Sequence, residues 1–171
     1  MSVPTRTAAR TTVPHERAYR DALAQFATGV TVICARASDG TLAGFTANSF
    51  NSVSLDPPLV VWSLARSASN LAAFEQAEGY VINVLADDQV ELARRFAQPH
   101  ADRFAGVDYA VGPAGAPRII GCVAWFECRH HSQQRAGDHV LFIGQVEAFA
   151  RHAGAGLVFH RGRFGTTRPL E

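Results

Sequence analysis

A short polar segment between two apolar stretches carries most of the side chains that could hold a ligand. It spans residues 46–54, with the sequence TANSFNSVS. Small hydroxyl and amide side chains in an irregular connection leave backbone N–H groups free to face a ligand. A flat heteroaromatic ring with carbonyls and nitrogens along its edge suits such donors, and Ala47 leaves room at the ring face. A strand bend whose hydroxyls bond only to the backbone is the alternative explanation.

A second group of polar residues follows the next apolar stretch and contains Ser63, Arg66, Ser67 and Ser69. Ser67 or Ser69 can cap a helix that runs to about Ala77. Free N–H groups at a helix N-terminus and a guanidinium together favour phosphate binding. All sixteen basic residues are arginine, which excludes Schiff-base lysine chemistry and the lysine-dependent phosphate loop. The alternative is an ordinary serine cap beside an arginine that faces solvent.

His139 is the third candidate, because Gly137 and Asp138 precede it at the mouth of a predicted strand. An ordinary turn histidine is the alternative. The other histidines do not predict a metal site, since His130 and His131 are adjacent and point to opposite faces of a strand. The cysteines lack zinc spacing, and no G-x-S-x-G motif of a serine hydrolase occurs. We therefore expect no metal and no serine nucleophile.

The composition sets limits on partners and compartment. The chain has 171 residues, of which 47% are hydrophobic and 18% charged, with a net charge of +1. This balance is typical of a globular domain and offers no bulk field for nucleic acid or an anionic membrane surface. No apolar run reaches the roughly 20 residues that span a bilayer. Three cysteines in apolar surroundings are expected to be buried free thiols, so we expect a cytoplasmic protein.

These candidates must be positioned mainly by strands. Residues 1–14 are expected to form a flexible tail, and residues 15–168 one domain. Periodicity and β-branched runs predict strands over 30–35, from 42 towards 45, and over 59–64, 80–85, 118–129, 140–149 and 157–160. Helices are predicted over 15–26, from Ser67 or Ser69 to about 77, and from Asp87 or Asp88, with a loop over 98–117. Short turns and inserted rather than alternating helices favour a mainly β fold, an antiparallel barrel with helical additions.

Several ordered blocks of sequence resemble the short-chain flavin reductases, the reductase components of two-component flavin-dependent monooxygenases. The likeness runs from about Phe26 to Phe164. Its blocks are FATGVTV (26–32), TANSF (46–50), SVSLDPPLV (52–60), VINVL (81–85), Gln89 with Leu92-Ala93 and Phe96-Ala97, DRFAGV (102–107), GDH (137–139) and HRGRF (160–164). The last block ends in Phe164, where tyrosine is common in the family.

This resemblance implies a six-stranded antiparallel Greek-key barrel of the FMN-binding split barrel type. It also implies a homodimer with flavin near the interface, FAD or FMN as cofactor, and NADH or NADPH as co-substrate. His139 would then lie near the nicotinamide. The implied cofactor-binding residues are Thr46, Ala47, Asn48, Ser49, Ser52, Ser54, Ser63, Arg66, Ser67, Ser69, Asn83, Phe104 and Arg163.

The activity that the resemblance implies is NAD(P)H:flavin oxidoreductase, with free reduced flavin passed to an oxygenase component. The absence of an obvious acid/base pair fits this expectation, because the cofactor carries the hydride chemistry. Two alternatives stay open at this point. The same fold could hold flavin tightly and act on its own substrate, or it could bind flavin without catalysis.

Overall fold

The computed structural model describes residues 16–98 and 102–170. The predicted tail over residues 1–14 lies outside the described residues. Most of the secondary structure is β-strand, as the sequence predicts, and every strand pair in the described residues is antiparallel.

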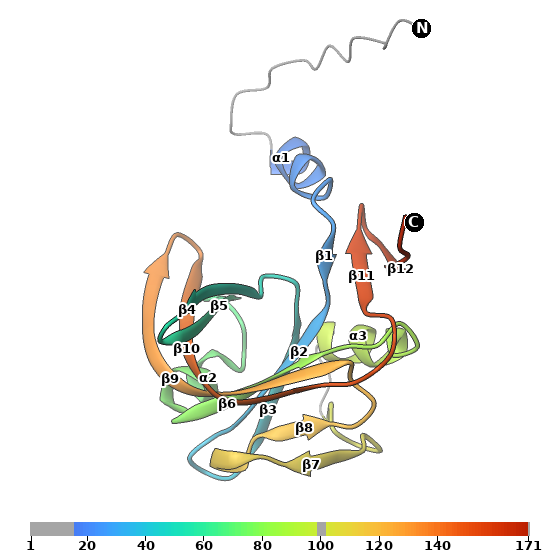
Figure 1. Cartoon of the computed structure of the whole chain (residues 1–171). Helices are drawn as coiled ribbons and strands as arrows, with labels where there is room; N and C mark the ends of the chain where they lie inside the picture. The colour runs from blue at the N-terminus through green and yellow to red at the C-terminus, as the bar shows by residue number, and fades with distance from the viewer. Residues whose placement is uncertain (1–15, 99–101, 171) are drawn as a thin grey trace, which may run out of the picture.

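The largest sheet has seven strands, one more than the six expected for the barrel (Figure 1). In spatial order they are β3 (Leu42–Ala47), β2 (Thr31–Arg36), β6 (Gly79–Val84), β9 (Ala124–Ala136), β10 (His139–Arg151), β5 (Pro58–Ala65) and β4 (Asn51–Leu55). The extra strand is β4, which we had expected to be part of an irregular segment. Its serines lie on an exposed edge, where polar side chains cost little and the backbone can still pair with β5.

Two small sheets complete the β structure. One contains β1 (Thr28–Gly29), β11 (Leu157–His160) and β12 (Arg163–Thr166), and the other pairs β7 (Tyr109–Val111) with β8 (Pro117–Ile119). The expected loop over 98–117 is therefore partly wrong, since β7 and the start of β8 lie in it. Both strands are three residues long, too short for a periodic pattern to reveal them.

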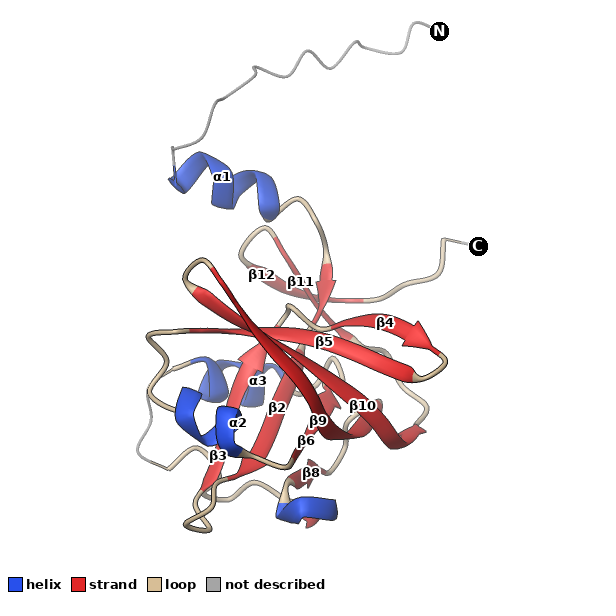
Figure 2. Cartoon of the chain, turned by 90° about the vertical axis from the view of Figure 1, so that its left-hand side faces the viewer, coloured by secondary structure: helices blue, strands red, loops and turns tan. Residues whose placement is uncertain are grey.

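Three α-helices and one 3-10 turn occur among the described residues: α1 (Glu16–Leu23), α2 (Leu71–Gln76), α3 (Val90–Ala97) and the turn Pro113–Gly115. Figure 2 shows α1 standing apart from the main sheet, and none of its residues is buried. The predicted serine cap of α2 is wrong, because Asn70 occupies that position. No helix within residues 16–98 and 102–170 is long and apolar enough to cross a membrane.

The core is built around an aromatic group inside the curved main sheet. Trp62 and Phe142 stack with ring centroids 4.2 Å apart, and Phe74 and Tyr80 meet Trp62 edge-on. All four side chains are buried. A second cluster, centred on Phe96, fills the space between α3 and the other face of the sheet. The three cysteines are buried and unpaired, which confirms that expectation.

The long hairpin of β9 and β10 differs from its predicted boundaries and thereby reaches the candidate site. The sequence predicts strands over 118–129 and 140–149, with the polar residues between them outside the strands. In the structure these polar residues extend β9 to Ala136, paired with β10 as far as His139. Backbone hydrogen bonds hold this arm together and need no apolar side chains. The hairpin tip is thus carried to the end of β5, where His139 pairs with Ala65.

Candidate functional site

The segment from Thr46 to Ser49 begins as the end of β3 and becomes irregular only at residues 48–50. The Thr46 hydroxyl donates to the Ala93 carbonyl at 2.7 Å, and the Ala47 carbonyl accepts from the Thr31 hydroxyl at 2.8 Å. Both residues therefore bond within the protein, as the strand-bend alternative expects. Asn48 is exposed, and its side chain has no hydrogen-bond partner in the described residues. It remains available to a ligand.

Ser49 ties this segment to β5. Its hydroxyl accepts from the Ser63 backbone N–H at 3.0 Å and donates to the Ser63 carbonyl at 3.2 Å. The two bonds fix the position of the neighbouring Asn48 relative to β5. Ser63 thus takes part in the site through its backbone, so the predicted role of its hydroxyl stays a prediction.

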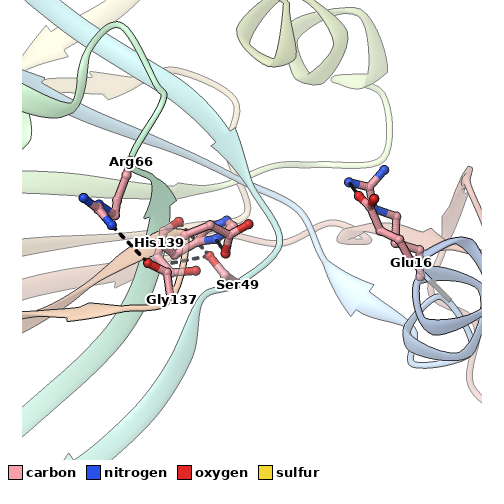
Figure 3. A network of polar contacts seen from close by, with 8 residues as sticks. Glu16, Ser49, Arg66, Gly137 and His139 are labelled. Carbon is pink, nitrogen blue, oxygen red and sulfur yellow. Dashed lines mark hydrogen bonds and ion pairs between the residues drawn. The ribbon is translucent and has the colours of Figure 1, made fainter. Parts of the chain in front are cut away.

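The turn after β5 meets the tip of the β9–β10 hairpin (Figure 3). The Arg66 N–H donates to the Asp138 carbonyl at 2.9 Å, and its guanidinium reaches the Gly137 carbonyl at 3.4 Å. Gly137 has a φ of +59°. The first position of a two-residue hairpin turn requires a positive φ, which glycine adopts without steric strain. Ser49, Arg66 and His139 are therefore gathered at one end of the sheet from three distant parts of the sequence.

Asp138 orients the His139 ring. His139 Nδ1 lies 2.8 Å from Asp138 Oδ1, and an ionised carboxylate can only accept, so Nδ1 carries the shared hydrogen. That leaves Nε2 to face other partners. The hydrogen bond from His139, then its charge, lowers the pKa of Asp138 below its ordinary value, with a smaller contribution from Arg20. The His139 side chain remains 43% exposed, so a ligand can reach it.

A cavity of about 750 Å³ lies beside the start of α2 and contains two of the predicted residues, Ser69 and Phe104. Asn70 and Arg103 also line it, and both donate to the Gly44 carbonyl, at 3.2 and 2.9 Å. Arg103 was not predicted as a site residue, although it precedes Phe104 in the DRFAGV segment (102–107) that resembles the family. With Ser69 and Arg103 in its wall, the cavity offers both a hydroxyl and a cation.

The structure does not bring all predicted residues to these places. Asn83 is fully buried, donating to the Val32 and Pro117 carbonyls and accepting from the Ile119 N–H. These contacts give it a structural role, and we leave it out of the proposed site. Ser67 is exposed next to Arg66, Ser52 and Ser54 lie on β4, and Arg163 is exposed on β12.

A second cavity, of about 470 Å³, has Asn48 in its wall. Its remaining lining comes from α1, from β1 with the turn before it, and from the end of β11 with the turn after it, and includes Phe26, Phe159 and Arg161. Phe26 and Phe159 were not predicted as site residues. In the HRGR sequence of the turn (160–163), Arg161 or Arg163 was considered as a contact for a nicotinamide 2′-phosphate, with pairing to an acidic residue as the alternative.

A family model described as the flavin reductase like domain matches residues 23–168. The chain therefore belongs to the flavin reductase-like domain family, which confirms the resemblance. The chain is 44% identical over 151 residues to the FMN reductase (NADH) SmoA of Agrobacterium fabrum, covering 88% of this chain and 86% of that protein.

Two further proteins show the range of the similarity. The reductase component of the flavin-dependent trigonelline monooxygenase of Acinetobacter baylyi is 45% identical over 150 residues, 88% of this chain and 48% of that protein. The structure of the Streptomyces globisporus NADH:FAD oxidoreductase SgcE6, in complex with NAD and FAD fragments, matches with a TM-score of 0.87 and 38% identity, covering 95% of this chain and 99% of that one. The chain spans between 48% and 64% of the length of three curated relatives that it matches.

Proposed function

We propose that this chain is an NAD(P)H:flavin oxidoreductase that reduces FAD or FMN and releases it to a partner monooxygenase. The observation that carries the proposal is the meeting of Asn48, Arg66 and His139 at one end of the sheet. The names of two relatives support this proposal, because one is an FMN reductase (NADH) and the other is the reductase component of a monooxygenase.

The residues present fit a flavin. Within residues 16–98 and 102–170, neither the Asn48 amide nor the buried Thr28 hydroxyl oxygen has a hydrogen-bond partner, and both residues line the same cavity. Such a donor and acceptor pair suits the carbonyl and N–H edge of an isoalloxazine ring. The Arg66 guanidinium makes one long hydrogen bond of 3.4 Å, and Ser67 and Ser69 are exposed next to it. These three side chains would hold the flavin phosphate.

The chain's own task is to bind and orient, because bound flavin accepts the hydride from nicotinamide and so supplies the redox chemistry. Asn48 and the backbone beside it would stabilise negative charge that develops at the ring edge. His139, held by Asp138, would position the nicotinamide over the flavin ring. Bringing the two rings together in a reactive orientation would be the main contribution of these residues to the rate.

The direct test is a steady-state matrix of NADH and NADPH against FAD, FMN and riboflavin, followed by absorbance at the nicotinamide band. We expect oxidation of the nicotinamide to depend on added flavin and to saturate with it. A rate no greater than that of buffer with flavin would refute the proposal. Flavin that stays bound through gel filtration at one equivalent, without activity on added flavin, would instead favour a reductase acting on its own substrate.

The flavin site is proposed to lie near the interface of a homodimer. Large apolar side chains on the main sheet support a protein partner, since Leu55 is 93% and Phe149 is 70% exposed. Phe149 continues an aromatic row with Phe126, at 6.3 Å, and Phe50. Contiguous apolar side chains on the surface of a folded domain, such as this aromatic row, are typical of an interaction surface. A second copy of the chain is the occupant that we propose.

The proposal also covers the fold type of the domain and its place in the cell. We take residues 15–168 as one domain of the flavin-binding split-barrel type, and the curved sheet around Trp62 supports the barrel description. We place the protein in the cytoplasm. Three buried, unpaired cysteines support a reducing compartment.

A further inference from the structure

The cavity of about 470 Å³ beside Asn48 combines positive charge with aromatic surface. Arg20 of α1 and Arg161 of the turn between β11 and β12 contribute the charge. Phe26, which is 73% exposed, and Phe159 contribute aromatic rings. The Arg161 N–H donates to the Ala24 carbonyl at 3.0 Å, which joins the end of α1 to this turn.

The backbone conformation of Arg161 is unusual for an arginine. It has a φ of +51°, and Gly162 has a φ of +77°, while the flanking His160 and Arg163 are paired. Two successive positive φ values define the hairpin turn that favours Asn-Gly or Gly-Gly. An arginine at the first position is disfavoured by contact between its Cβ and the backbone. Local folding therefore does not explain why arginine stands here.

The Arg161 side chain has no ion pair or hydrogen bond with any residue in 16–98 or 102–170. It is thus a free cation, held by a disfavoured turn, in the wall of a cavity next to Asn48. Arg20 pairs with Glu16 on the exposed side of α1 at 2.6 Å. Its charge also makes a small contribution to the lowered pKa of Asp138.

We propose that this cavity binds the phosphate-bearing part of the nicotinamide co-substrate, with Arg161 as the main phosphate ligand and Arg20 as a second. The inference rests on the proposed function and adds a subsite to it. A guanidinium binds phosphate oxygens through two parallel N–H groups, and the neighbouring rings offer faces for stacking a nucleoside base. Asn48 lies in the wall of the same cavity, so a dinucleotide seated there has one end near the proposed flavin ring.

The test uses Arg161→Asn, which places a turn-favoured residue at this position and is expected to fold at least as well as the original chain. Arg161→Lys keeps the charge without the planar fork. The matched control is Arg151→Ala, which removes an exposed arginine at the end of β10. We expect Arg161→Asn to raise the KM for NADH about 10- to 100-fold, the range for losing a charge-assisted hydrogen bond. The kcat and the KM for flavin should change less than about twofold, because the reacting atoms are untouched.

Binding of ADP-ribose, measured by calorimetry without flavin, gives a readout independent of turnover. We expect measurable binding to the original chain, weaker binding to Arg161→Lys, and none to Arg161→Asn. An unchanged KM for NADH, or a loss confined to the KM for flavin, would overturn the proposal, the latter by assigning the cavity to the flavin phosphate. If the original chain shows no reductase activity, the proposed function fails, while ADP-ribose binding still decides the site.

Discussion

Gly44→Ala tests the packing that shapes the larger cavity. A Cβ at this position would lie 2.7 Å from Phe96 Cε1 and 2.9 Å from Phe104 Cζ. Favourable carbon contacts are about 3.5–4.0 Å, so the rings must move by about 0.6–0.8 Å or more. Phe96 is buried and held by α3, whereas Phe104 lines the cavity and has room to shift. The methyl group should therefore displace Phe104 first.

Overpacking of this kind costs about 1–3 kcal/mol of unfolding free energy. For a chain of this size, each kcal/mol lowers Tm by about 2–4 °C, so we expect a fall of about 2–12 °C. Thermal unfolding followed by circular dichroism measures it. The displaced ring should also raise the KM for flavin, because Phe104 lies in the cavity wall beside Ser69.

The matched control is Gly165→Ala, because nothing lies within 4 Å of a Cβ there and Gly165 does not have a positive φ. Its Tm should stay within about 1 °C of the original chain, as for most surface substitutions. Adding Phe104→Leu to Gly44→Ala should recover part of the lost Tm by removing the Phe104 ring atom that lies 2.9 Å from the new Cβ. A Gly44→Ala chain that unfolds at the original Tm would refute the close approach of the two rings.

Three further predictions concern His139 and the proposed dimer. His139→Ala should lower kcat/KM for NADH roughly tenfold, the value of one hydrogen bond, without changing flavin affinity by fluorescence titration; an equal loss of both would contradict its assigned role. Because the folded-state pKa of Asp138 lies below its ordinary 3.8, its contribution to stability is present above that value and is lost as pH falls through the folded pKa. His139→Ala should then lose less stability than the original chain between pH 5 and pH 3, measured by urea unfolding, whereas equal losses would argue against the pair. Leu55→Asp should leave the Tm of the monomer unchanged but change the molar mass measured by light scattering from that of a dimer to that of a monomer. If the variant is still a dimer, the β4 edge is not part of the interface.

The sequence predicts the apolar strands well because their side chains define a buried face. Val32 and Ile82, for example, lie in the strands expected over 30–35 and 80–85, and both are fully buried. Polar strands escape such reasoning. The exposed end of β9 and the whole of β4 are held by backbone pairing with the strand that follows across a two-residue turn. Their polar side chains carry no apolar pattern that would report this pairing.

In the candidate site, too, local sequence identifies single residues but not how they come together. Asn48, Arg66 and His139 were each identified from local sequence, but their meeting depends on the register of β5 with β10, which joins Ala65 to His139. The cap of α2 was misassigned because Asn70, Ser67 and Ser69 are all good capping types, and Asn70 holds the position without a side-chain capping hydrogen bond. The Asn70 amide donates to the Gly44 carbonyl on β3, a partner that the sequence around the helix does not reveal.

Two hairpin turns show why disagreement with local preference is informative. The β9–β10 turn carries glycine where positive φ is required, at Gly137, so turn chemistry alone explains its sequence. The β11–β12 turn requires positive φ at two positions and carries Arg161 at the first. Where local preference and the residue disagree, selection has acted on something other than folding. At Gly137 the backbone forms the contact with Arg66. At Arg161 only the side chain is left to explain the residue, and that side chain lines a cavity and has no partner within residues 16–98 and 102–170.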